Sequence, residues 1–293
     1  MIAFGVAITD PEIYERFGAP GIRWAAEPNS EVLAFEGTES LFRTYNLILD
    51  QAAALDGLEA LVLLHQDSEI VDPDFCGKLR EALREPDVAI VGSIGALGVR
   101  NMAYWEGSVT WASFAQRYEE LGGGELQGVS WDRNTMPDYA HTGEVDSIDG
   151  FMFAMSPWAV RELRFDEALG PFHGYDLDIC LQARAAGRKV VTADLRVIHH
   201  HSLEFLRDAE GWIQAHIKIA EKWDGQLAGV GEAAGDWKQR ARRAEAEASA
   251  ARLQARALEA RGRAVEAMTI KSTSWRLTKP ARRLGSLFRR RRR

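Results

Sequence analysis

The chain has 293 residues, of which 46% are hydrophobic and 27% are charged, the balance of a globular protein with a substantial core. This composition excludes collagen-like, largely disordered and disulfide-scaffolded proteins. The formal net charge of −7 hides an asymmetry, because residues 269–293 carry ten Lys or Arg and no Asp or Glu. The remaining body is strongly acidic, so we expect no nucleic acid partner for it. With two cysteines, no apolar run long enough for a membrane span and no signal peptide, we expect a cytoplasmic protein.

Short β-rich runs and helical patterns alternate through the first hundred residues. Strands are predicted at 2–8, 31–35, 58–64 and 88–94. Helices are predicted after Asp10, over 38–54 with Thr38 as N-cap, and from Asp72-Pro73 to about Arg84. This alternation predicts an α/β fold with a Rossmann-like, mostly parallel sheet flanked by helices. Ligands of such sheets bind at the carboxyl ends of the strands, where this chain has Thr9, Asp10, Glu36, Gln66 and Asp67.

A different kind of segment follows. Residues 96–141 are rich in aromatic residues and glycine, and we expect an irregular insertion or lid with a short helix near 111–121. Beyond it, strands are predicted at 145–155 and 189–198, and helices after Ser156, over 173–186 and over 203–223.

The composition changes after residue 224. We therefore predict a domain over 1–224, a small-residue linker over 225–235, an exposed helix over 236–268 and a basic amphipathic tail over 269–293. The apolar stripe of the long helix is mostly Ala, which leaves two alternatives, a coiled coil that pairs two subunits and a helix that extends alone.

The turn after the buried 58–64 run is acidic and could bind a metal ion. Asp67 offers hard oxygen ligands for a divalent cation, which in turn could clamp a diphosphate. The alternative is an Asp that caps the following turn, and this motif alone leaves both open.

Two further clusters could take part in chemistry. Asp176 and Asp178 begin a predicted helix, where one could act as general base and the other as a cap, or both could be ordinary first-turn acids. His199, His200 and His201 follow a strand, and one imidazole could ligate the metal held by Asp67, the alternative being a polar strand end. The glycines at 122–124 lack the Lys-Ser/Thr of a P-loop.

The order of these motifs resembles that of the family 2 glycosyltransferases with the GT-A fold, especially the branch of streptomycin-biosynthesis-type and surface-polysaccharide enzymes. The resemblance covers roughly residues 1–222. It rests on Ser40–Asn46, Leu63–Asp67, Ile148–Phe151, Gly174–Ile179 and Val197–His199.

The resemblance implies a role for each matching position. Asp67 and His199 become the ligands of Mg²⁺ or Mn²⁺, although His65 replaces the first Asp of the family's Asp-x-Asp motif and leaves metal dependence open. Asp176 becomes the general base, with Tyr175 in place of the family's Glu. The implied donor-binding residues are Thr9, Asp10, Glu36, Asn46 and Gln66. The implied acceptor-side residues are Gly150, Tyr175 and Asp178.

The resemblance also implies a function and partners. A nucleotide-sugar donor would transfer its sugar to a hydroxyl acceptor with inversion, in the assembly of a surface polysaccharide or glycolipid. Residues 274–293 interleave aromatic and basic residues, and we expect them to hold the protein on the inner face of an anionic membrane, near a lipid-linked acceptor, unless they form only a disordered basic tail. The alternatives are a glycosyltransferase of a soluble secondary metabolite and a non-catalytic GT-A-like scaffold. A homodimer through 236–268 is a further expectation.

Overall fold

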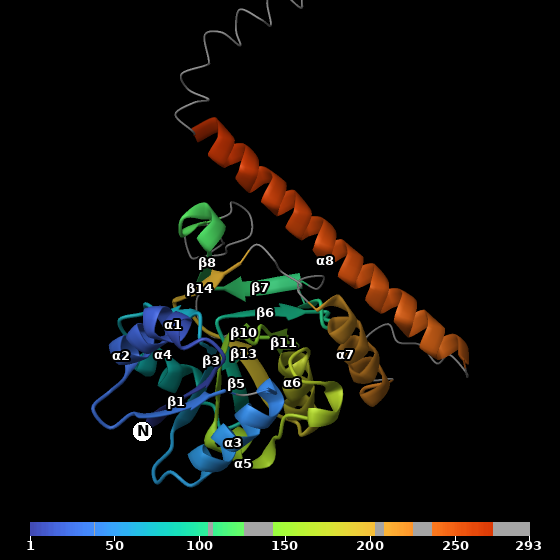
Figure 1. Cartoon of the computed structure of the whole chain (residues 1–293). Coiled ribbons are helices and arrows are strands. Elements are labelled where there is room, and N and C mark those ends of the chain that lie inside the picture. Colours follow the sequence, from blue (N-terminus) through green and yellow to red (C-terminus); the bar gives the residue numbers. More distant parts are fainter. Residues whose placement is uncertain (38, 105–107, 126–142, 203–207, 225–235, 272–293) are drawn as a thin grey trace, which may run out of the picture.

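The computed structural model describes residues 1–37, 39–104, 108–125, 143–202, 208–224 and 236–271. At its centre is a seven-stranded sheet (Figure 1). In spatial order its strands are β10 (Gly143–Glu144), β13 (Lys189–Thr192), β5 (Val88–Gly92), β12 (Met152–Met155), β3 (Ala60–His65), β1 (Ile2–Ile8) and β2 (Glu31–Glu36). β3, β1 and β2 are parallel, as are β5 and β13, whereas β12 runs antiparallel to both of its neighbours. The predicted mostly parallel α/β sheet is confirmed.

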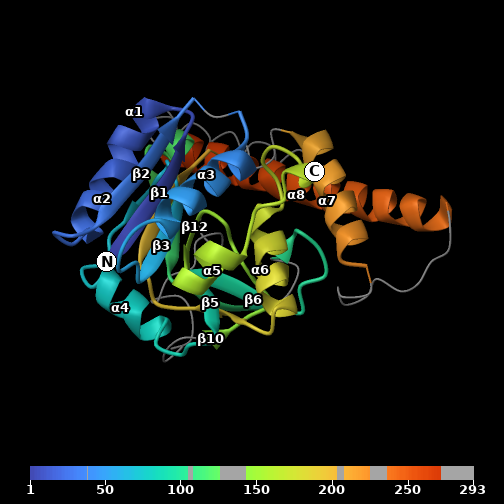
Figure 2. The ribbon, with the colours of Figure 1, turned by 90° about the horizontal axis from the view of Figure 1, so that it is seen from below.

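Helices cover both faces of this sheet. Figures 1 and 2 show α2 (Ala19–Ala25) and α4 (Phe75–Ala82) on one face, and α3 (Leu41–Ala53), α5 (Pro157–Glu162) and α6 (Tyr175–Ala185) on the other. The short α1 (Pro11–Ile13) leads into α2 through a π-helical turn. Because the sheet is covered on both sides, β1 and β3 are almost wholly buried, as their continuous apolar runs predict.

The starts of two helices differ from the prediction. α3 begins at Leu41, and its N-cap is Ser40, whose hydroxyl accepts from the Arg43 N–H; Thr38, the predicted cap, lies outside the described residues. α4 begins three residues later than predicted. The Asp72 carboxylate accepts hydrogen bonds from the Asp74 N–H and from Lys78, so it fixes the turn before the helix instead of lying in its first turn.

Three runs that the sequence predicts as single strands are each divided between two sheets. The pieces that lie outside the central sheet are β6 (Ile94–Leu97), β11 (Ser147–Ile148) and β14 (Val197–His201). β6 pairs with β11 on one side and with β7 (Ser108–Ala112) on the other. β14 pairs with β4 (Ser68–Ile70) and β8 (Phe114–Tyr118), and β8 also pairs with β9 (Gly124–Glu125). Val88–Gly92 and Ile94–Ala96 are buried on both sides of the first break, so that apolar run gives no sign of it.

The predicted helix near 111–121 is wrong. β7 and β8 occupy most of that range, and only a single 3₁₀ turn follows at Glu119–Leu121. Phe114 and Tyr118, both buried, are four residues apart. This spacing suits one face of a helix and also one face of a strand, so periodicity could not separate the two.

The C-terminal helices form a pair. α7 (Ala209–Lys222) begins after Asp208, which caps it, rather than at 203, and 203–207 lie outside the described residues. α8 (Asp236–Lys271) confirms the long predicted helix. Its predicted complete exposure is wrong, because Ala246 and Ala250 are buried in the core. The predicted linker at 225–235 and the tail beyond 271 lie outside the described residues. Among the residues described, no helix combines the length and apolar character that crossing a membrane requires.

Candidate active site

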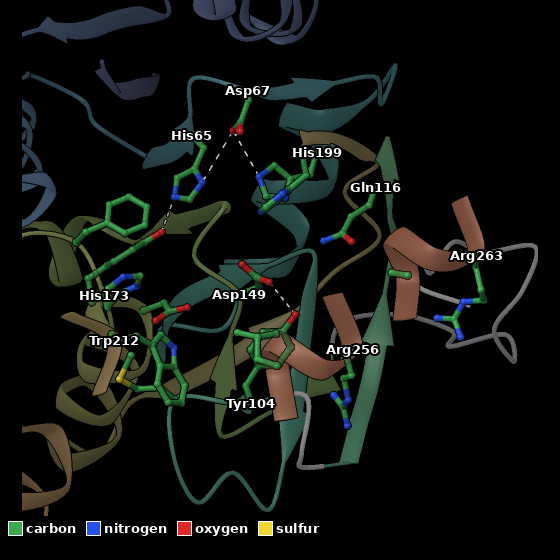
Figure 3. A pocket seen from close by; sticks show the side chains of 18 residues that line it. His65, Asp67, Tyr104, Gln116, Asp149, His173, His199, Trp212, Arg256 and Arg263 are labelled. Atoms are coloured by element: carbon green, nitrogen blue, oxygen red, sulfur yellow. Dashed lines mark hydrogen bonds and ion pairs between the residues drawn. The ribbon is translucent and has the colours of Figure 1, made fainter. Parts of the chain in front are cut away.

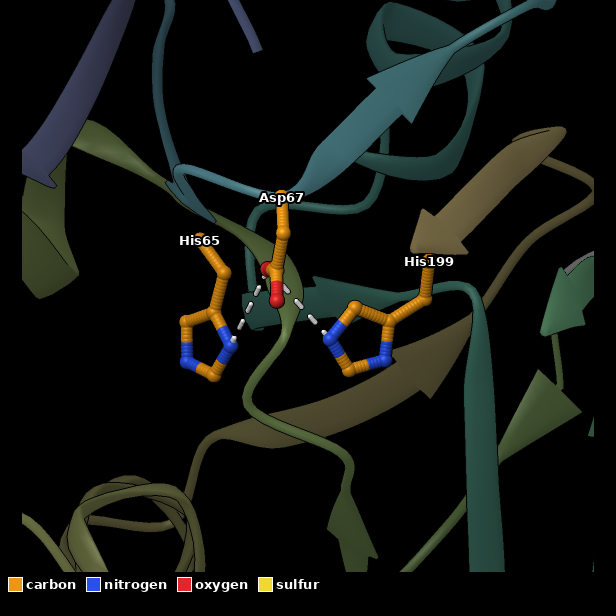
Figure 4. A group of neighbouring side chains, drawn as sticks. All are labelled: His65, Asp67 and His199. Carbon is orange, nitrogen blue, oxygen red and sulfur yellow. Dashed lines mark ion pairs between the residues drawn. The ribbon is translucent and has the colours of Figure 1, made fainter. Parts of the chain in front are cut away.

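Three side chains from distant parts of the sequence converge where β3 ends. His65 is the last residue of β3, Asp67 lies in the following turn, and His199 lies in β14. β4 begins directly after Asp67 and pairs antiparallel with β14, with Ser68 opposite His199. This strand pairing therefore places His199 beside the turn that contains Asp67. Figure 4 shows both imidazole rings beside the Asp67 carboxylate.

The distances within this group suit a bound cation. His199 Nε2 lies 3.4 Å and His65 Nδ1 lies 4.0 Å from Asp67 Oδ1. One ligand atom from each residue lies within 4.8 Å of the other two. Asp67 Oδ1 and His199 Nδ1 are also buried without a hydrogen-bond partner in the described residues. Because buried polar atoms are rarely left unpaired, two imidazoles and a carboxylate in this arrangement fit a divalent metal ion.

The charge states of Asp67 and His65 agree with ligation. For His199, burial lowers the pKa, but the Asp67 carboxylate outweighs this effect and raises that pKa, so a metal ion would displace the proton of the ring. Burial raises the pKa of Asp67, but His199 and His65 outweigh that effect and hold this pKa well below its usual range. Burial lowers the pKa of His65 to about 4, so its ring is neutral at neutral pH. His65 Nε2 lies 2.6 Å from the Tyr175 hydroxyl, which leaves Nδ1 facing Asp67. Metal ions bind an ionised carboxylate and a neutral imidazole that a second hydrogen bond orients.

A pair of carboxylates lies in the same pocket. Asp176, in the first turn of α6, accepts hydrogen bonds from the Gly150 N–H at 3.2 Å and from the Leu177 N–H at 2.9 Å. Burial, followed by the negative charge of Asp149, raises the pKa of Asp176 to about 7 despite these donors. A carboxylate with a pKa near neutrality is suited to accept a proton during catalysis.

Asp149 was not among the predicted site residues. Its Oδ2 accepts a hydrogen bond of 2.7 Å from the Tyr104 hydroxyl, and its Oδ1 accepts from the Phe151 N–H. The sequence signal that could have found it is its place between a buried strand end and Gly150. A side chain at Gly150 would overlap the Tyr175 hydroxyl, so the glycine lets the ring of Tyr175 lie against the backbone.

His65, Asp67 and His199, together called the metal group below, line a single pocket of about 720 Å³ with the carboxylates of Asp149 and Asp176. Figure 3 shows the two groups facing this space, with His173 and Trp212 on one side of it. A further wall comes from α8 through Leu253, Arg256, Ala260 and Arg263. This wall was not predicted from the sequence, because α8 was expected to be an exposed helix outside the domain.

The predicted donor residues at the strand ends contact one another. Gln66 Oε1 accepts from the backbone N–H groups of Thr9 and Asp10, at 2.8 Å each, and Gln66 Nε2 donates to Thr9 Oγ1. The Asp10 carboxylate caps α1, and Glu36 ends β2 beside Ile8. These residues therefore gather at the carboxyl ends of β1, β2 and β3, as predicted, but do not line the pocket in Figure 3.

Two other predicted site residues have structural partners instead. Both polar atoms of the Asn46 side chain bond to the backbone of Phe165, at 2.9 Å each, which ties α3 to the segment after α5. Asp178 is 1% exposed and accepts from the indole N–H of Trp223 and from the Lys222 ammonium. The donor role of Asn46 and the acceptor-side role of Asp178 therefore do not fit the geometry. In a helix, residues two positions apart point in different directions, so Asp176 faces the pocket while Asp178 faces α7.

Comparison with known proteins places this geometry in a family. A family model described as "Glycosyltransferase like family" matches residues 3–220, about three quarters of the chain. Streptomycin biosynthesis protein StrF of Streptomyces griseus is 29% identical over 205 residues, which cover 69% of this chain and 67% of StrF. O-antigen biosynthesis protein RfbC of Myxococcus xanthus is 27% identical over 172 residues, which cover 56% of this chain and 13% of RfbC.

A solved structure supports the fold. The structure of GalNAc-T7 with UDP, GalNAc and Mn²⁺ matches with a TM-score of 0.52 at 11% identity, over 78% of this chain and 48% of that chain. The predicted GT-A fold is confirmed, and the family match includes both the metal group and the carboxylate pair but ends before α8. The chain therefore belongs to the family 2-like glycosyltransferases, enzymes that take a sugar from a nucleotide-sugar donor.

Proposed function

We propose that this protein transfers a sugar from a nucleoside-diphosphate sugar to a hydroxyl acceptor and inverts the anomeric configuration. The observation that carries the proposal is the position of a cation site and a near-neutral carboxylate in one pocket. Direct displacement requires charge stabilisation at the leaving diphosphate and a base at the attacking hydroxyl. A pocket that is lined by both groups can meet both requirements.

Asp176 is the proposed general base. Its carboxylate takes the proton of the acceptor hydroxyl while that oxygen forms a bond to the anomeric carbon and the bond to the diphosphate oxygen breaks. The diphosphate leaves with the bonding electrons. The Gly150 and Leu177 N–H groups orient the carboxylate. Burial, and after it the charge of Asp149, keeps the pKa of Asp176 high enough to accept the proton.

His65, Asp67 and His199 are the proposed ligands of the metal ion. A divalent cation held there would neutralise charge that develops on the leaving diphosphate. The Tyr175 hydroxyl fixes the orientation of the His65 ring. Because two of the three donors are imidazoles, we propose Mn²⁺ rather than Mg²⁺, which prefers an all-oxygen shell. The Mn²⁺ bound by GalNAc-T7 supports this choice within the fold.

Thr9, Asp10, Glu36 and Gln66 remain the proposed nucleotide side of the site. Their position at the carboxyl ends of three adjacent parallel strands supports this, since that edge is where such sheets bind nucleotides. For Asp10 and Gln66, whose side chains are engaged by the backbone, the proposed role is to shape the strand ends rather than to contact the donor.

The biological context has two candidates. The similarity to RfbC favours assembly of a surface polysaccharide or glycolipid in the cytoplasm, with residues 274–293 on an anionic membrane surface. The similarity to StrF, which covers more of both chains, favours modification of a soluble secondary metabolite. A chain ended after residue 271 separates them, because it should lose transfer only if the acceptor is at a membrane. Sedimentation of the full chain tests the proposed homodimer through 236–268.

The proposed activity is tested by calorimetric titration with a panel of UDP-, GDP-, CDP- and dTDP-sugars, in Mn²⁺ and in EDTA. We expect one donor to bind in Mn²⁺ and to bind at least about tenfold more weakly in EDTA. A product whose anomeric configuration is opposite to that of the donor, read by proton NMR, establishes inversion. A protein that binds no donor under either condition would favour the non-catalytic scaffold.

A further inference from the structure

We propose that α8 forms the acceptor side of the active site, where Arg256 and Arg263 recognise a phosphate group on the acceptor. This inference rests on the proposed glycosyltransferase function and extends it to the acceptor. The family match ends at residue 220, so both arginines lie outside the region shared with the family. In this pocket, among the residues that the structure describes, the only Lys or Arg side chains are these two.

The docking of α8 fixes where the two arginines lie. Ala246 and Ala250 are buried against the domain, and the small side chains let the helix axis come close. Arg242 lies within 3.0 Å of Asp224 and 3.6 Å of Glu221, which secures the same part of α8 to the end of α7. Leu253, Arg256, Ala260 and Arg263 follow at helical spacing and face the pocket.

The charges in the pocket are divided between two sides. Asp67, Asp149 and Asp176 come from the glycosyltransferase domain, and the positive groups come from α8. Figure 3 shows Arg256 and Arg263 beyond Gln116 and Tyr104, away from His65 and Asp67. Since the leaving diphosphate belongs beside the metal group, an anion that the arginines bind belongs to the other substrate.

The arginines are suited to a phosphate group. Arg256 is exposed and makes no hydrogen bond or ion pair with the described part of the chain, and Arg263 has one ion pair, at 4.0 Å to Glu259. They are seven residues apart, about 10 Å along the helix axis, so two long side chains can converge on one group between them. Guanidinium groups bind phosphate oxygens in pairs, and among the described residues no competing partner holds Arg256.

The same chemistry could come from a soluble phosphorylated acceptor or from a lipid-linked phosphate. The experiment uses the full chain, saturated with Mn²⁺ and with UDP or GDP, whichever binds, so that the donor side is occupied. The soluble probe is glucose 6-phosphate, and glucose is its uncharged control. The lipid probe is a phosphatidylcholine vesicle containing undecaprenyl phosphate, with phosphatidylglycerol vesicles of equal charge as the control for the basic tail.

The variant is R256Q/R263Q, and the matched control is R261A on an exposed position of the same helix that does not line the pocket. Gln and Ala are good helix formers, so we expect unchanged thermal unfolding in both. We expect one phosphate probe to bind wild type and R261A equally and R256Q/R263Q at least about tenfold more weakly. The nucleoside diphosphate should bind all three equally. Binding of glucose 6-phosphate indicates a soluble acceptor, and binding of the undecaprenyl phosphate vesicles alone indicates a lipid-linked one.

Equal phosphate binding by R256Q/R263Q, or no phosphate binding by wild type, would overturn the inference. Weaker binding of the nucleoside diphosphate to R256Q/R263Q would also overturn it, because the arginines would then hold the donor. If the proposed function is wrong, neither wild type nor either variant would bind a nucleoside diphosphate. Comparing phosphate binding by R256Q/R263Q and by R261A would still show whether Arg256 and Arg263 bind phosphate.

Discussion

Replacing Asp176 by Asn should stabilise the protein and slow its transfer of sugar. The pocket raises the pKa of this carboxyl from 3.8 to about 7, first by burial and then by the charge of Asp149. Three pKa units correspond to about 4 kcal/mol, which is an upper limit for the cost of ionising Asp176 in the folded state. The unfolded chain releases this proton at a lower pH than the folded chain does. Wild-type stability is therefore lost as the pH rises from about 4 to about 7.

The assay is urea unfolding of wild type and D176N between pH 4 and pH 8. The variant has no charge at this position, so its advantage should be greatest above pH 7 and should close toward pH 4. The difference between the two curves cancels the histidines, which titrate in both proteins. If D176N is less stable than wild type at pH 8, the argument that the pocket disfavours ionisation of Asp176 is refuted.

Asp178 provides the control, because it lies two residues away in the same helix with the opposite surroundings. Its buried carboxylate is paired with Lys222 and with the Trp223 indole. D178N removes this charge, leaves Lys222 paired with Asp166 alone, and weakens the hydrogen bond from the Trp223 indole, so we expect a loss of about 2 kcal/mol at pH 8. Opposite signs for the two substitutions would show that surroundings, not sequence position, decide which aspartate is poised for catalysis.

Three further predictions follow from the same geometry. D149N removes a negative charge beside Asp176 and should lower the pKa of Asp176. The acidic limb of the pH profile of transfer should therefore move below 7 without reaching 3.8, since Asp176 remains buried. An acidic limb that stays at the same pH or rises would show that Asp149 does not raise this pKa. G150A should displace Tyr175, whose hydroxyl holds His65, and weaken Mn²⁺ binding about tenfold by calorimetry; unchanged affinity would refute this support. R242A should loosen α8, which we expect to appear as faster hydrogen exchange over 246–264 with nucleotide binding intact; unchanged exchange would contradict the docking.

The sequence predicted the parts of the site that depend on strand ends. A continuous apolar run identifies a strand covered on both faces, so it predicted the turn that holds Asp67. Three successive histidines after a strand indicated one possible metal ligand, and the family resemblance implied that it is His199. The proposed base, Asp176, came from the family resemblance together with its place in the first turn of a helix. At each of these positions, the local sequence shows where a strand ends or a helix begins.

The parts that were missed depend on long-range packing. The breaks within 88–97, 145–155 and 189–201 move each chain segment from one sheet to another, and they depend on which strands pair with each piece. Asn46 and Asp178 are polar residues in the right motifs, yet their bonding partners lie more than 40 residues away. The α8 wall was invisible because an Ala-rich stripe has low hydrophobicity whether it is buried or exposed.

The most direct test of the proposed mechanism compares donor binding with transfer in two variants. In Mn²⁺, D67A should lose both, because the carboxylate holds the metal ion that the donor needs. D176N should bind the donor as tightly as wild type and transfer its sugar about 10²–10⁴-fold more slowly, the usual contribution of a general base. Transfer at the wild-type rate by D176N, or donor binding by D67A that is equally tight and still metal-dependent, would contradict the mechanism.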